Sequence, residues 1–186
     1  MAMIDERHVE WRVVDRLREL LDRQPEADHD VTLTYALFTA ILCWACQRMR
    51  DKGRPLAIWD SLRRERAADH PWGVIGLPAE MVGDGPLETL PASVFLVGLR
   101  NATAHGDDRA VSPLHIGVEG RADRRLAGFI FDTEFYDKEQ KQHWGRWRLS
   151  ITKVDMRRIG LALADRFCDQ LGGDARHDAE RHVLVA

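Results

Sequence analysis

The residues of this sequence that could perform chemistry meet in one short stretch, LRNATAHGD, at residues 99–107. An apolar segment ends there with Arg100, Asn101 and His105. Residues four positions apart lie on one face of a helix, so Asn101 and His105 should point the same way. Arg100 is turned from Asn101 by about 100°, which its long side chain can span. We therefore expect the three polar side chains to converge on one anion.

These three residue types are sufficient for the cleavage of RNA. RNA carries its own nucleophile, the 2′-hydroxyl, so the reaction needs a proton acceptor and donor, and positive charge beside the pentacoordinate phosphate. His105 can transfer protons near neutral pH, Arg100 supplies charge, and Asn101 can orient the histidine or a phosphate oxygen. One histidine must make both transfers, unless a two-fold dimer brings a second copy to the same groove. The structural alternative is a helix end at His105 and Gly106, with Arg100 paired to a surface carboxylate.

The hexapeptide RNATAH, residues 100–105, resembles the R-[polar]-x-x-x-H signature of the HEPN superfamily. The resemblance implies Arg100, Asn101 and His105 as the catalytic residues of a metal-independent endoribonuclease that needs no cofactor and leaves 2′,3′-cyclic phosphate ends. It also implies a homodimer that acts on RNA in a toxin–antitoxin or phage-defence setting, with an antitoxin protein as a further partner. Some HEPN domains bind without cutting, so the alternative is a non-catalytic module that binds a nucleotide, an RNA or a protein.

Hydrophobic periodicity indicates the elements that must position these residues. Apolar residues at helical spacing predict five helices, over residues 5–23, 30–52, 55–68, 90–105 and 154–171. The glycine- and proline-rich residues 70–88 predict a long loop. Aromatic and β-branched residues predict two antiparallel strands over 126–135 and 145–154, with 114–118 as a third.

The fold class expected from these elements is mainly α, a HEPN-like helical bundle of about five helices with a β-hairpin inserted before the last helix. The hairpin is similar to that of plasmid- and prophage-associated HEPN groups. We expect a single domain over residues 1–173, with the hairpin insertion at about 113–152. Gly172 and Gly173 should end the last helix, and residues 174–186 should form a polar C-terminal tail.

Composition narrows the class of protein. The chain has 45% hydrophobic and 31% charged residues, which is ordinary for a globular protein. A net charge of −3 does not indicate a nonspecific nucleic-acid binder. Three cysteines cannot pair completely, and the longest apolar run is too short to cross a bilayer, so we expect a cytoplasmic protein without a membrane partner. Arg63, Arg64 and Arg66 form a basic run typical of a solvated helix face.

Two further motifs have both a functional and a structural interpretation. Arg146, Trp147 and Arg148 could stack on and grip single-stranded RNA. Strand alternation explains the same residues more simply, with Trp147 inward and both arginines in solvent. Cys43 and Cys46 have the spacing of zinc or redox sites, but they lie in an apolar helix without a second ligand pair, which favours core packing.

Overall fold

The structure, a computed structural model, describes residues 6–23, 30–50, 56–70, 79–81, 87–104, 110–117 and 124–183. The elements found in this part of the chain are, in order, α1 (Glu6–Asp22), α2 (Val31–Met49), α3 (Ala57–Arg64), η2 (Ala67–Asp69), β1 (Ala79–Met81), η4 (Leu87–Thr89), α4 (Ala92–Ala104), β2 (Val111–Gly117), β3 (Arg124–Asp137), β4 (Gln142–Thr152) and α5 (Lys153–Val183).

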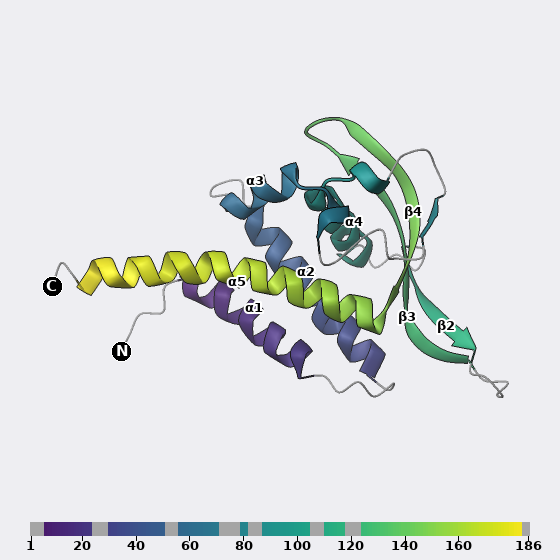
Figure 1. The fold of residues 1–186 in the computed structure, drawn as a ribbon. Helices are drawn as coiled ribbons and strands as arrows, with labels where there is room; N and C mark the ends of the chain where they lie inside the picture. Colours follow the sequence, from purple (N-terminus) through teal and green to yellow (C-terminus); the bar gives the residue numbers. More distant parts are fainter. Residues whose placement is uncertain are drawn as a thin grey trace.

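The strands form an antiparallel sheet that is a layer of its own, in the order β1-β4-β3-β2. The expectation of a mainly α, HEPN-like bundle with an inserted β-hairpin is therefore wrong. In Figure 1 the helices lie to one side of this sheet, with α4 beside β3. The inner face of the sheet packs against the helical core, because alternate side chains of β3 and β4 are fully buried, among them Phe131, Phe135, Leu149 and Ile151.

The helical layer is centred on α2, which contacts α1, α4 and α5. Nine of its residues are buried, which agrees with an apolar helix in the middle of the fold. The helix begins directly after Asp30, as predicted, although the Asp30 side chain makes no capping hydrogen bond. Leu33 and Trp44 remain exposed on its outer side.

The last helix is longer than the sequence predicts. α5 continues to Val183, so Gly172 and Gly173 do not end the helix and residues 174–183 are helical. Two glycines cost about 1 kcal/mol each in a helix interior, and the alanine, arginine and glutamate residues that follow favour helix. None of the described helices is both long and apolar enough to cross a membrane.

The sheet and the helices meet most closely where α4 lies on β3. A Cβ atom at Gly98 would overlap the ring of Phe135, which is fully buried. The Gly98 carbonyl also accepts a hydrogen bond of 3.1 Å from the Thr133 hydroxyl. The absence of a side chain at position 98 therefore allows this spacing, which fixes α4 relative to the sheet.

The variant Gly98→Ala should be less stable than the natural protein. The added methyl group would overpack a buried ring at a cost of up to about 3 kcal/mol, which exceeds the roughly 1 kcal/mol gained from the helix propensity of alanine. Urea unfolding followed by circular dichroism measures the difference. Gly117→Ala is the control, because a Cβ there meets nothing within 4 Å. An equal change in both variants would contradict the importance of the Gly98 contact.

Candidate functional site

Arg100 and Asn101 lie together near the C-terminal end of α4. Leu96, Leu99 and Ala102 are buried, which leaves the two polar residues at the surface. The Arg100 guanidinium donates a hydrogen bond of 3.1 Å to the Asn101 side-chain oxygen. The structure therefore brings together two of the three predicted site residues. The third, His105, lies outside the described residues.

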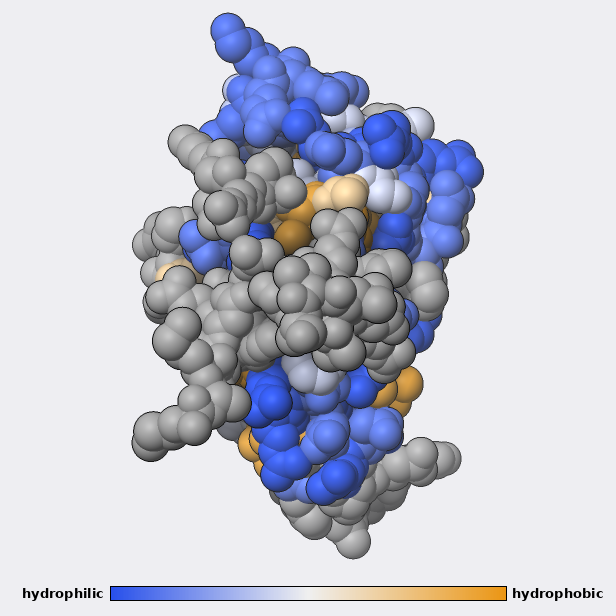
Figure 2. All heavy atoms as spheres, turned by 90° about the vertical axis from the view of Figure 1, so that its left-hand side faces the viewer, coloured by the Kyte–Doolittle hydropathy of each residue, from blue (hydrophilic) through white to orange (hydrophobic). Residues whose placement is uncertain are grey.

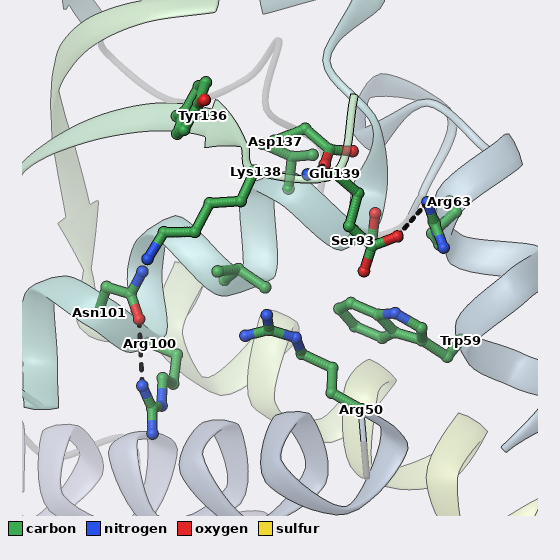
Figure 3. Close-up of a pocket in the computed structure, with 12 residues that line it drawn as sticks. Arg50, Trp59, Arg63, Ser93, Arg100, Asn101, Tyr136, Asp137, Lys138 and Glu139 are labelled. Atoms are coloured by element: carbon green, nitrogen blue, oxygen red, sulfur yellow. Dashed lines mark hydrogen bonds and ion pairs between the residues drawn. The ribbon is translucent and has the colours of Figure 1, made fainter. Parts of the chain in front are cut away.

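The Arg100–Asn101 pair lines a groove with a volume of about 330 Å³. The walls come from the end of α2, from α3, from α4 and from the turn between β3 and β4 (Figure 3). The lining residues are Arg50, Trp59, Arg63, Ser93, Val94, Val97, Arg100, Asn101, Tyr136, Asp137, Lys138 and Glu139. Four elements distant in sequence therefore build one site.

Positive charge predominates among these residues, with four cationic side chains from four elements and two carboxylates. Glu139 forms an ion pair with Arg63, with a distance of 2.7 Å between Oε2 and the guanidinium nitrogen. No described carboxylate forms an ion pair with Arg50, Arg100 or Lys138. Three cations thus line the groove without a described anionic partner, and an anionic ligand would neutralise them.

An aromatic wall accompanies the cations. The Arg50 guanidinium lies 5.7 Å from the centre of the Trp59 ring, within the range of a cation–π contact. In Figure 3 the Arg100–Asn101 pair lies at one end of the groove, while Trp59 and Arg63 lie at the other. Cations beside an aromatic side chain match the chemistry of a nucleotide, which joins a phosphate to a ring that stacks.

A polar cluster holds α3, which carries Trp59 and Arg63, against α5. Arg166 of α5 donates to both carboxylate oxygens of Glu65, at 2.6 and 2.8 Å, and also to the Ser61 hydroxyl. The Nδ1 atom of His70 lies 3.2 Å from Arg166, and its Nε2 atom lies 2.7 Å from Glu65. A guanidinium can only donate, so Nδ1 accepts and the ring proton sits on Nε2.

The pKa values in this cluster follow from these contacts. The hydrogen bond from Arg166 lowers the pKa of Glu65 to about 2. Burial, followed by the positive charge of Arg166, lowers the pKa of His70. The folded protein therefore favours an ionised Glu65 and a neutral His70.

The remaining sequence candidates lie elsewhere. Arg146 donates to Asp132 at 2.6 Å, and the Trp147 indole donates to the Trp144 carbonyl at 2.8 Å. Arg146 and Arg148 are exposed on β4, and neither they nor Trp147 lines the groove. Cys46 is buried, and burial raises the pKa of its thiol to about 12, as expected of a core residue.

Sequence reasoning missed five of the charged residues that line the groove, namely Arg50, Arg63, Asp137, Lys138 and Glu139. Arg63 was predicted to belong to a solvated face, and the other four carry no local motif. One weak signal was present, because Lys138 is one of only four lysines in the chain and lies in the polar turn between two predicted strands.

No known protein family, curated protein or solved structure matches this chain.

Acid should weaken the contact between α3 and α5 in two stages. Because the pKa of His70 is lowered, the unfolded chain takes up a proton below about pH 6.5 that the folded protein does not, so the free energy of unfolding falls from there. The contribution of Glu65 is present above its ordinary pKa of 4.5 and is lost as the pH falls toward about 2. Urea unfolding at a series of pH values measures both stages.

The variant His70→Gln separates the two stages. It should lose the pH dependence that begins near pH 6.5 while keeping the dependence at lower pH. If the free energy of unfolding of this variant still falls by the same amount in the first stage, that stage belongs to another titratable group.

Proposed function

We propose that the protein is a metal-independent endoribonuclease of the HEPN type that cleaves RNA in the groove at the end of α4. The observation that carries the proposal is the hydrogen-bonded pair of Arg100 and Asn101, which lines the groove together with Arg50 and Lys138. A volume of about 330 Å³ suits one nucleotide of a single strand. The resemblance of residues 100–105 to the HEPN signature supplies the expected reaction.

In the proposed reaction the 2′-oxygen of the RNA attacks the adjacent phosphorus, and the bond from phosphorus to the 5′-oxygen breaks. The products are a 2′,3′-cyclic phosphate and a 5′-hydroxyl. Arg100 and Asn101 stabilise the negative charge that accumulates on the phosphate oxygens. His105 takes the proton from the 2′-hydroxyl, and a protonated histidine returns one to the leaving 5′-oxygen.

The proposal includes a homodimer, because a second copy would supply the second histidine. Leu33 and Trp44 support it, since they lie about three turns apart on one side of α2 and are 46% and 45% exposed. Sedimentation of the purified protein measures its oligomeric state, and a monomer at every concentration would leave both proton transfers to one histidine. An RNA substrate and three free cysteines favour a cytoplasmic location. The proposal also includes an antitoxin protein as a further partner, in a toxin–antitoxin or phage-defence setting.

A second function is favoured by one observation on the groove. The described residues that line the groove include cations and an aromatic ring, which can bind a phosphate and a base. The Glu139 carboxylate of the groove is already in an ion pair with Arg63. A module that binds a nucleotide, an RNA or a protein partner without cleavage would need no more. Binding without cleavage in the experiment below would select this function.

The purified protein should cleave single-stranded RNA in excess EDTA and leave 2′,3′-cyclic phosphate ends. Arg100→Ala should slow cleavage by about 100-fold or more, because it removes a group that stabilises the developing charge. His105→Ala should slow it by a similar or larger factor through the loss of proton transfer. Gel analysis of an end-labelled RNA measures both rates.

Arg64→Ala is the matched control. Arg64 is an exposed arginine of α3 that does not line the groove, so its loss should leave the rate within about two-fold. Circular dichroism establishes that each variant is folded. Strict dependence on a divalent metal, or full activity of His105→Ala, would refute the mechanism.

A further inference from the structure

The turn between β3 and β4 crosses the groove and contributes one residue to each of two walls. Glu139 reaches α3, where it pairs with Arg63 at 2.7 Å. Its neighbour Lys138 extends toward Asn101 of α4 (Figure 3). Successive residues of one turn therefore point toward opposite ends of the groove.

Hydrogen bonds within the turn fix its conformation. The Asp137 carboxylate accepts the backbone N–H groups of Glu139 at 2.8 Å and Gln140 at 3.1 Å. Lys141 adopts the left-handed conformation, with φ of 53°, that completes the turn. The charge of Asp137 is thus directed to the backbone. Of the described carboxylates that line the groove, Glu139 is the one that pairs with a cation.

The ion pair of Glu139 and Arg63 is open to exchange. The Glu139 side chain is 67% exposed and that of Arg63 is 32% exposed, so water screens the pair and makes it weak. A phosphate oxygen accepts hydrogen bonds from a guanidinium in the same geometry as a carboxylate oxygen. A phosphate in the groove would also be attracted by Arg50 and Lys138, which Glu139 does not contact in an ion pair.

We propose that Arg63 is a further phosphate-binding residue of the groove. In this proposal Glu139 remains paired with Arg63 until a phosphodiester of single-stranded RNA replaces the Glu139 carboxylate. The proposal rests on the proposed function for the identity of the anion. Glu139 thereby lowers the affinity of the groove for every anion. An anion that displaces Glu139 must contact Arg63 and the cations at the other end of the groove at the same time. A chain of phosphates meets that requirement better than a lone inorganic phosphate does.

Binding of a fluorescein-labelled, 2′-O-methylated single-stranded RNA tests the proposal, because that oligonucleotide cannot be cleaved through its 2′-oxygen. Fluorescence anisotropy at several salt concentrations gives the affinity and its salt dependence. Glu139→Gln should bind about two- to five-fold more tightly, the range expected for release of an exposed ion pair. Arg63→Gln should bind more weakly, and its slope of log K against log salt should fall by about 0.7 because one phosphate contact is lost.

The double variant Arg63→Gln/Glu139→Gln supplies the specific outcome. Without Arg63, removal of the Glu139 carboxylate should no longer tighten binding. Glu134→Gln is the matched control, because it removes the same charge from an exposed residue of β3 that pairs with His143 and does not line the groove. Thermal unfolding establishes that each variant is folded.

The outcomes separate this proposal from the proposed function. Equal tightening by Glu134→Gln and Glu139→Gln would assign the effect to long-range charge and overturn the role of Glu139. Binding that Arg100→Ala weakens but that Arg63→Gln leaves unchanged would overturn the role of Arg63 and keep the groove as the RNA site. Failure of the natural protein to bind the oligonucleotide at all would overturn both proposals.

Discussion

The close approach of α4 to β3 at Gly98 is the contact on which the groove depends. α4 is buried on the sides that face the sheet and the other helices, so its position is set by packing before any polar residue is placed. The ring of Phe135 fills the space that a side chain at Gly98 would need. Two of the groove walls follow from this, because Arg100 comes two residues after Gly98, and the turn containing Lys138 begins soon after Phe135. A change in that spacing would therefore move the two walls relative to each other.

Local sequence patterns correctly predicted the helices whose ends are marked by local signals. The predicted fold class was wrong because the sheet depends on strand pairing between segments far apart in the sequence. α1 and α4 lie within three residues of their predicted ends, because apolar spacing and a neighbouring loop define them. β1 has only three residues and lies in a glycine- and proline-rich segment, where no alternation can be seen. Its partner is β4, far along the chain, so the sequence around Ala79 contains no sign of a fourth strand. With β1 and the fourteen residues of β3 included, the strands form a layer rather than an inserted hairpin.

The site divides in the same way between local and non-local information. Helical geometry was enough to predict that Arg100 reaches Asn101, because both lie on one helix. It could not place Arg50, Trp59 and Lys138 beside them, since these come from the end of α2, from α3 and from a turn. Arg63 shows the difference most clearly. A basic run on a helix is usually solvated, and only the fold brings Glu139 within 2.7 Å of it.

The charge of the groove differs in sign from that of the whole chain, and this difference limits where an anionic ligand can bind. The net charge is −3, while the groove has four cationic side chains and two carboxylates, an excess of two positive charges. Interactions between exposed charges are screened beyond about 8 Å at physiological salt, so a phosphate in the groove responds mainly to the nearby arginines and lysine. Elsewhere the described surface is mixed, and Figure 2 shows mainly hydrophilic side chains on one face with small hydrophobic areas. An acidic protein whose described surface carries this cationic groove gains little from nonspecific contact with nucleic acid outside it. The net charge of the chain is therefore compatible with the proposed RNA substrate, which would bind in the groove and not on the rest of the surface.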